Sequence, residues 1–296
     1  MEHKPRILIV QSAGEHLENR EFRESLCIKR ALDLIGVPNT VWGKGYPTFA
    51  IPFPKISKDF DILLIVENYD FSWIPDLKEF KGAKIMWSID SHLVFDKHAE
   101  FVTAQEIKLV LDSNVMMTPK WTERKIDSVW FANCYDHLLI KPKLDIQKSH
   151  VIGFCGSRGH QERDAQLDEI TEQMKARSIE LKQDILVIGD NMVNAVNSYM
   201  IHWNMNIAND INYRTFETCG CQTALLTNYT NGLDMLFDVE NEVITWASPV
   251  ELLQKAQRYC KDIAECMRIA KNGYERALRD HTYEVRMNNL IKFLYG

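Results

Sequence analysis

Long apolar runs are missing from this sequence of 296 residues. A membrane-spanning helix needs roughly 18 consecutive apolar residues. The longest apolar runs here are short, such as those at 7–10 and 62–66. The first residues lead directly into such a run, without the apolar stretch of a secretory signal. We therefore expect a protein with no membrane partner that lies in the cytoplasm, or in the host cytoplasm if the protein is viral.

Cysteine pairs and an excess of positive charge are missing as well. The seven cysteines are an odd number and form no paired Cys-x-x-Cys array, which favours reduced, buried thiols over disulfides or a zinc site. The net charge of −6 means that bulk electrostatics do not attract nucleic acid. Local basic clusters could be solvated helix faces or a nucleic-acid surface; they are Arg20/Arg23, Lys29/Arg30 and Lys120/Arg124/Lys125.

Short apolar runs alternate with amphipathic stretches along the whole chain. We expect strands at 6–11, 39–42, 61–66, 83–89, 115–118, 128–131, 151–154, 185–188, 204–208, 223–227 and 242–246. We expect helices at 17–35, 103–112, 120–126, 162–177, 213–219, 249–272 and 282–294. This alternation predicts an α/β protein with parallel, doubly wound sheets.

A polar, proline-containing stretch at 137–150 interrupts the alternation and predicts a linker between two domains. The N-terminal domain would then comprise residues 1–140 and the C-terminal domain residues 141–296, with the last helix able to pack back on the N-terminal domain. In such sheets, ligands bind beyond the carboxyl ends of the strands. The loops at those ends are therefore the places to look for functional residues.

A loop with small residues and arginines follows the first strand of the second half. It reads GFCGSRG at 153–159, and it contains Gly156, Ser157 and Arg158, with Arg163 close behind. Small residues let the backbone approach an anion, a helix N-terminus offers free N–H groups, and arginines add positive charge. The loop predicts a phosphate or diphosphate site, although a plain β-turn fits the same residues.

A second polar segment lies at 209–220. A short helix that starts near Asn212 would bring its N-terminal amides and Arg214 to the same edge of the sheet as Arg158. Glu217 lies one turn further along that helix, where its carboxylate can accept hydrogen bonds from two vicinal hydroxyls, as in a ribose. The alternative is a surface glutamate in an ion pair.

Taken in order, four segments resemble a known family. They are GFCGSRGHQER, INYRTFETCGCQTALLTN, LFDVENEVITWASPVELLQKAQRY and HTYEVR. The chain resembles the GT-B glycosyltransferases, and more narrowly the CgeB-like (spore-maturation-type) branch of glycosyl transferase group 1. The resemblance covers residues 151–290 well and 60–140 more loosely. It implies an α/β GT-B fold, in which two Rossmann-like domains face each other across a cleft.

The resemblance implies a hexosyltransferase whose C-terminal domain binds a nucleotide-diphosphate sugar, with a UDP-sugar favoured. Glu217 would hold the ribose hydroxyls, and the rest of the donor site would consist of Gly156, Ser157, Arg158, Arg163, Asn209, Asn212, Tyr213 and Arg214. No metal and no cofactor are implied, because arginines and a helix dipole take the place of a metal. Asn209 stands where retaining members carry a glutamate, so inversion and retention both stay open.

The N-terminal domain should bind the acceptor and supply any catalytic base. Glu15 and His16 follow the first expected strand, and Asp90 and His92 follow the fourth. In an inverting enzyme, Asp90 or Glu15 would be the base, followed by His92 or His16. In a retaining enzyme these groups would hold the sugar or the acceptor. Either histidine could instead be a helix cap or a buried imidazole.

The acceptor is open between DNA and other hydroxyl compounds. Some bacteriophage enzymes of this build glucosylate hydroxymethylated pyrimidines in DNA, and four aromatic residues here could stack on a flipped base: Trp42, Phe49, Trp73 and Trp87. A small molecule or a cell-surface glycan is the alternative acceptor. A non-catalytic nucleotide-sugar-binding protein is a further alternative, and an epimerase-like enzyme is disfavoured because residues 11–14 contain no GxGxxG. Nothing in the sequence indicates an oligomeric state.

Overall fold

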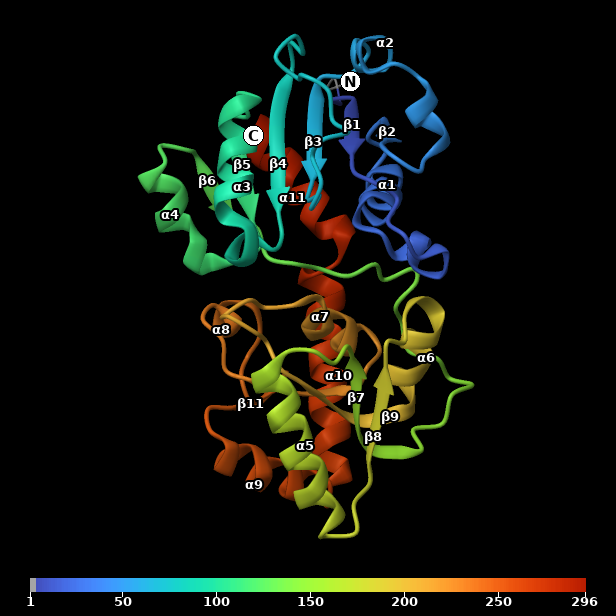
Figure 1. Ribbon diagram of the computed structural model, residues 1–296. Coiled ribbons are helices and arrows are strands. Elements are labelled where there is room, and N and C mark those ends of the chain that lie inside the picture. Colours follow the sequence, from blue (N-terminus) through green and yellow to red (C-terminus); the bar gives the residue numbers. More distant parts are fainter. Residues whose placement is uncertain (1–3) are drawn as a thin grey trace. The chain divides into compact units, whose positions relative to one another are not determined.

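The computed structural model describes residues 4–296 and divides into two compact units (Figure 1). Unit 1 extends to Asn133 and also contains Tyr283–Gly296, whereas unit 2 comprises Cys134–Thr282. The division therefore falls at 133/134, seven residues before the predicted boundary at 140/141. The last helix is part of unit 1.

Unit 1 is built on a six-stranded sheet in the order β2-β1-β3-β4-β5-β6, in which every neighbouring pair is parallel. Strands β1 and β3 are continuous apolar runs because a parallel sheet is covered on both faces; in β1, no residue is more than 1% exposed. The strands are β1 (Ile7–Val10), β2 (Asn39–Trp42), β3 (Ile62–Val66), β4 (Ala83–Ser88), β5 (Leu109–Asp112) and β6 (Ser128–Trp130).

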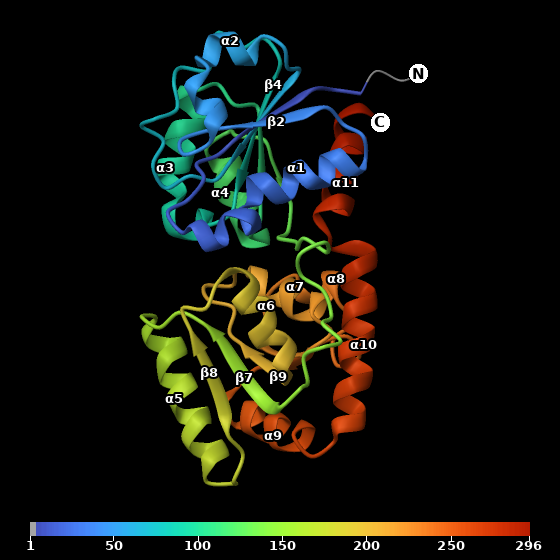
Figure 2. The same ribbon diagram turned by 90° about the vertical axis from the view of Figure 1, so that its right-hand side faces the viewer.

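Helices cover the two faces of this sheet. The helices of unit 1 are α1 (Glu24–Leu34), α2 (Phe53–Ser57), α3 (Ser91–Ala104), α4 (Thr118–Glu123) and α11 (Tyr283–Tyr295), with short 3₁₀ helices at Leu17–Phe22, Pro47–Ala50 and Val115–Met117. One core cluster joins α2, α3 and α4 to the sheet through Phe53, Ala99 and Trp121. Helix α11 packs beside α1 (Figure 2), and its Tyr283 ring contacts Trp87 of β4.

Unit 2 has a five-stranded sheet in the order β11-β10-β9-β7-β8, again entirely parallel. Its strands are β7 (His150–Gly156), β8 (Leu181–Ile185), β9 (Tyr199–Asn204), β10 (Ala224–Asn228) and β11 (Ile244–Trp246). Its helices are α5 (Gln161–Lys175), α6 (Gly189–Ser198), α7 (Tyr213–Gly220), α8 (Leu233–Leu236), α9 (Pro249–Tyr259) and α10 (Ile263–Asp280). The predicted α/β class with two parallel sheets is confirmed.

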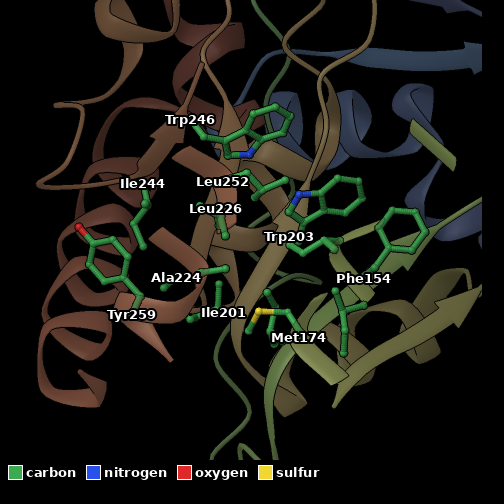
Figure 3. Packing of buried hydrophobic residues seen from close by; sticks show 14 of the residues in the cluster. Phe154, Met174, Ile201, Trp203, Ala224, Leu226, Ile244, Trp246, Leu252 and Tyr259 are labelled. Carbon is green, nitrogen blue, oxygen red and sulfur yellow. The ribbon is translucent and has the colours of Figure 1, made fainter. Parts of the chain in front are cut away.

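Large side chains fill the core of unit 2. Figure 3 shows Phe154, Trp203 and Trp246 at the strand ends, with Met174 of α5 and Tyr259 of α9 packed against the same cluster. Burying such aromatic rings contributes much of the stability of a core, because each removes a large apolar area from water. The cluster ties α5 and α9 to the sheet.

Several predicted elements are wrong in position or type. The helix expected at 103–112 is instead the end of α3 and the strand β5. The stretch at 115–118 is a 3₁₀ helix, and the helix expected at 17–35 is broken at Arg23, whose ψ of 137° is extended. In unit 2, the strands expected at 185–188 and 204–208 lie earlier, as β8 and β9, and helix α6 between them was not predicted.

The helix expected at 249–272 is two helices. It begins at a capping box, where Ser248 Oγ accepts the Glu251 N–H at 3.2 Å, but α9 ends at Tyr259. Helix α10 then passes through Gly273 without interruption. A Cβ at Gly273 would lie 2.4 Å from the Glu242 carbonyl oxygen, so this glycine permits close packing and does not end the helix.

Among residues 4–296, no helix combines the length and the apolar character needed to cross a bilayer. All seven cysteines are free thiols, and six of them are buried.

Candidate functional site

The strand orders locate one switch point in each unit. In unit 1 the chain leaves β1 toward β2 and returns to β3 on the other side; in unit 2 it leaves β7 toward β8 and returns to β9. Loops diverge at the carboxyl ends of such strands and leave a crevice in which ligands bind. The candidate sites are therefore the loops after β7 and β9 in unit 2, and those after β1 and β3 in unit 1.

The loop after β7 carries the predicted glycines and arginines, each held by the protein itself. Arg163 donates from Nη2 to the Ser157 carbonyl oxygen at 2.6 Å and stacks its guanidinium over Phe154. Gly159 has a φ of +115°, which favours glycine. Gly156 ends β7 beside the Phe154 ring, where a Cβ would come within 2.8 Å of it.

Arg158 departs from the predicted arrangement. Its Nη1 lies 2.8 Å from Asp168 Oδ1 on α5, and its Nη2 donates to Gln183 Oε1 of β8, also at 2.8 Å. The guanidinium is therefore engaged by α5 and β8. Arg214 of α7, and not Arg158, donates to the backbone at the end of β7.

Helix α7 presents three side chains of one face to the end of β7. Arg214 donates from Nε to the Cys155 carbonyl oxygen at 3.2 Å and pairs through Nη1 with Glu217. Thr218, the next residue of α7, bonds His202 Nδ1 at 2.6 Å. The Arg214 side chain is 24% exposed and that of Glu217 12%, so the pair lies at the rim of the protein surface.

His202 of β9 contacts both Thr218 and the backbone of Cys155. Its Nε2 accepts the Cys155 N–H at 3.2 Å, so its proton is on Nδ1 and is donated to Thr218. Complete burial lowers the pKa of His202 to about 3, and the positive charge of Arg214 acts in the same direction. The backbone of Cys155 is thus bound at its N–H by a neutral imidazole and at its carbonyl oxygen by a guanidinium.

The N-terminus of α7 lacks a side-chain cap. Asn212 is the N-cap residue, yet its side chain makes no capping bond to the first turn. That side chain instead donates to Asn204 Oδ1 at 3.3 Å and to the Met205 carbonyl oxygen at 3.2 Å. First-turn amides without a side-chain cap, next to an arginine, are suited to bind phosphate.

A network of asparagines supports the loop between β9 and α7. Asn206 Oδ1 accepts from the Asn212 N–H at 3.1 Å, and Asn228 brackets the Asn206 backbone with bonds of 2.7 and 2.8 Å. Asn206 is 2% exposed, and within residues 4–296 its Nδ2 has no hydrogen-bond partner. Asn209 lies at the exposed tip of the loop with a φ of 55°, and Tyr213 is half-buried at the first residue of α7.

In unit 1, a cavity of about 590 Å³ lies at the switch point. Glu15 and His16, both exposed, are among its lining residues. Trp73 contributes an aromatic wall, and Arg23 and Lys44 contribute positive charge. The loops after β1 and β3 thus enclose a space in which acidic, basic and aromatic groups meet.

Asp90 and His92 follow β4, which lies next to β3 in the sheet. They therefore lie at the same edge of the sheet as the loops after β1 and β3. Tyr69, another residue of the cavity wall, donates its hydroxyl to Asp90 Oδ2. This bond connects Asp90 to the cavity that contains Glu15 and His16. His92 is half-buried, burial lowers its pKa, and within residues 4–296 its Nδ1 has no hydrogen-bond partner.

Sequence reasoning missed three residues of these sites: Glu67, His202 and Asn206. Glu67 directly follows β3, and its carboxylate accepts the backbone N–H of Asp90 at 2.6 Å. Polar residues at the carboxyl end of a buried strand are a signal that the sequence did contain. For His202 no such signal existed, because it lies inside a strand and its partners are distant in sequence.

Comparisons with known proteins agree with this geometry. Residues 172–292 match a family model described as glycosyl transferase-like. No curated protein matches the chain. Three solved structures cover nearly the whole chain, and at their low identities they show the fold.

An alpha-glucosyltransferase in complex with UDP and a 13-mer DNA containing an HMU base has 13% identity and a TM-score of 0.72, covering 99% of this chain and 100% of its own. Sucrose-phosphate synthase from Thermosynechococcus elongatus has 11% identity and a TM-score of 0.66, covering 99% of both chains. HepE from Anabaena, in complex with UDP and glucose, has 12% identity and a TM-score of 0.63, covering 98% of this chain and 99% of its own.

The chain has the GT-B fold, and the family match supports a glycosyltransferase enzyme. The family match lies in unit 2 and the start of α11, and it includes the whole of α7, where Arg214 and Glu217 are found. The glycine loop at 153–159 lies before the matched segment.

Proposed function

We propose that the protein transfers a hexose from a UDP-sugar, bound by unit 2, to a hydroxyl group of an acceptor bound by unit 1. The observation that carries the donor assignment is the N-terminus of α7, which lacks a side-chain cap and has Arg214 and Glu217 on one face of the helix beside the end of β7. Two of the similar solved structures contain UDP, which supports this choice of nucleotide.

The diphosphate would lie against the first-turn amides of α7 and the loop at Gly156 and Ser157, with Arg214 compensating its charge. Glu217 uses one carboxylate oxygen for Arg214, which leaves the other to accept from the ribose hydroxyls. Helix amides and an arginine supply the positive potential that a metal ion would otherwise provide. Transfer in this proposal needs neither a metal nor a cofactor.

The acceptor would enter the cavity of unit 1. Asp90 and Glu15 are the candidate bases, with His92 and His16 as second candidates, because carboxylates and imidazoles can accept a proton. Glu15 and His16 line the cavity, and Asp90 is bonded to Tyr69 of its wall. Asn209, in place of a glutamate, leaves the stereochemical outcome to experiment.

The acceptor that we favour is a 5-hydroxymethylpyrimidine in DNA. The DNA-bound alpha-glucosyltransferase resembles this chain over its full length, and the cavity combines Trp73 with the cations Arg23 and Lys44. An aromatic wall can stack on a base removed from the duplex, and cations can contact phosphates. We further propose that the protein belongs to the CgeB-like branch, that it modifies bacteriophage DNA, and that it acts in the host cytoplasm. A small molecule or a surface glycan is the alternative acceptor.

Nucleoside diphosphate release tests the proposal. UDP- and GDP-sugars would be incubated with the protein and with plain DNA, with DNA containing 5-hydroxymethylcytosine or 5-hydroxymethyluracil, or without acceptor. Release that requires the modified DNA and is lost in Glu217→Ala supports both donor and acceptor. The exposed Glu172→Ala on α5 is the matched control. Slow release without acceptor, lost in Glu217→Ala, redirects the search to other acceptors, and no nucleotide binding at all overturns the donor site.

A further inference from the structure

Glu67 is a buried carboxyl at the switch point of unit 1. It follows β3 directly and is 5% exposed. Carboxyl groups are rarely buried without a cation, and within residues 4–296 no arginine or lysine forms an ion pair with Glu67. Its position therefore calls for an explanation beyond packing.

The carboxylate organises the turn that presents Asp90. Glu67 Oε2 accepts two backbone N–H groups, that of Ile89 at 2.5 Å and that of Asp90 at 2.6 Å. These bonds fix the chain between the end of β4 and the start of α3. The Asp90 side chain makes no capping bond to α3 and instead accepts from Tyr69, at the wall of the cavity.

The two backbone N–H groups favour the ionised form of Glu67, whereas the neighbouring side chains do not stabilise its negative charge. His98 of α3 lies with Nδ1 4.0 Å from Glu67 Oε2 and bonds Ser88 Oγ at 2.7 Å, but burial and the neighbouring Lys97 lower its pKa to about 4. Asp90 and Glu24 add negative charge near the carboxyl.

Burial and these two carboxylates raise the pKa of Glu67 to about 8. Oε1 of Glu67 has no hydrogen-bond partner within residues 4–296 and is the oxygen free to carry the proton while Oε2 accepts the two amides.

We propose that Glu67 is a positioning residue, whose carboxyl accepts the backbone N–H groups of Ile89 and Asp90 and thereby holds Asp90 at the acceptor cavity. This inference rests on the proposed function, in which Asp90 acts at the acceptor. Both protonation states of the Glu67 carboxyl can accept these N–H groups at Oε2, so the position of Asp90 depends on the presence of an acceptor at residue 67 and not on its charge.

Transfer rates of Glu67 variants test this inference. In Glu67→Gln, an amide oxygen still accepts the backbone N–H groups, so kcat should stay within a few-fold of that of the unchanged protein. In Glu67→Ala, kcat should drop on the order of 10- to 100-fold with little change in donor binding, because the turn lacks its acceptor. The control Asp112→Asn changes a buried carboxyl that bonds Ser91 and Trp121, and it should keep kcat close to that of the unchanged protein.

A second measurement needs no activity. Amide hydrogen exchange at Ile89 and Asp90 should be faster in Glu67→Ala than in the unchanged protein and in Glu67→Gln. Undiminished kcat in Glu67→Ala, a loss in Glu67→Gln as large as that in Glu67→Ala, or equal exchange at Ile89 and Asp90 in all three proteins overturns the inference. If no variant and no donor gives transfer, the proposed function fails separately, and hydrogen exchange still decides whether Glu67 holds the turn.

Discussion

Acidification should weaken unit 2 through His202. Its Nε2 accepts the Cys155 N–H and must lose that bond when it gains a proton, next to the positive charge of Arg214. The pKa of His202 is about 3 in the folded chain against an ordinary value of 6.5. Protons therefore bind preferentially to the unfolded chain, and the free energy of unfolding falls as the pH drops below 6.5.

The size of this effect follows from the pH interval. Each pH unit below 6.5 costs about 1.4 kcal/mol of unfolding free energy as long as the folded chain keeps His202 neutral, so about 2 kcal/mol is lost at pH 5. In His202→Gln, the amide oxygen can accept the Cys155 N–H but cannot titrate. We expect this variant to be less stable at pH 7 by about 1 kcal/mol, because the hydrogen bond to Thr218 changes.

Urea unfolding between pH 7 and pH 5 measures the difference. The contribution of other groups, including the buried His98 of unit 1, is common to both proteins and cancels when one curve is subtracted from the other. The account predicts that the unchanged protein loses about 2 kcal/mol more than His202→Gln over this range. Parallel curves would mean that His202 accepts a proton in the folded state and would refute the reasoning.

Three further predictions concern other parts of the molecule. Glu217→Ala should weaken UDP-sugar binding by more than about tenfold, since charge-assisted hydrogen bonds contribute about 1.5–3 kcal/mol each, and calorimetry against Glu172→Ala checks this. Gly43→Ala should destabilise unit 1 by more than about 3 kcal/mol, because the new Cβ would lie 1.9 Å from the Gln11 carbonyl oxygen; a thermal midpoint equal to that of the parent would disprove it. For Glu67, whose folded pKa is raised to about 8, stability is present at low pH and lost as the pH rises; between pH 5 and 8 the parent should lose about 4 kcal/mol relative to Glu67→Gln, and equal slopes in urea titrations would contradict this.

The sequence predicts the strands of unit 1 better than those of unit 2. Strands β1 and β3 are continuous apolar runs, as expected in a sheet that is covered on both faces, so their positions can be predicted from the sequence. Strand β8 reads LKQDI and lies at the edge of its sheet, where half-exposed polar residues are tolerated. Because β8 is polar, the sequence did not indicate a strand there, and the strands expected on either side of α6 were placed too late in the chain.

The candidate site also contains parts that the sequence can predict and parts that it cannot. The spacing of Arg214 and Glu217 places both on one face of a helix, and this can be predicted from helical periodicity alone. The support that His202 gives to Cys155 joins two neighbouring strands across 47 positions in sequence, and no local pattern encodes it. Arg158 looked equivalent to Arg214 in the sequence, yet Asp168 and Gln183, which engage it, come from a helix and a strand whose pairing only the fold defines.

The central claim is that unit 2 binds a UDP-sugar at the N-terminus of α7 for transfer to a hydroxyl acceptor. The most direct measurement is UDP release from UDP-glucose by the unchanged protein, by Glu217→Ala and by Glu172→Ala, with and without DNA that contains 5-hydroxymethyluracil. The account predicts release that depends on the modified DNA, is lost in Glu217→Ala and is kept in Glu172→Ala. Equal release by Glu217→Ala and the unchanged protein, or no binding of any nucleotide sugar, would contradict it.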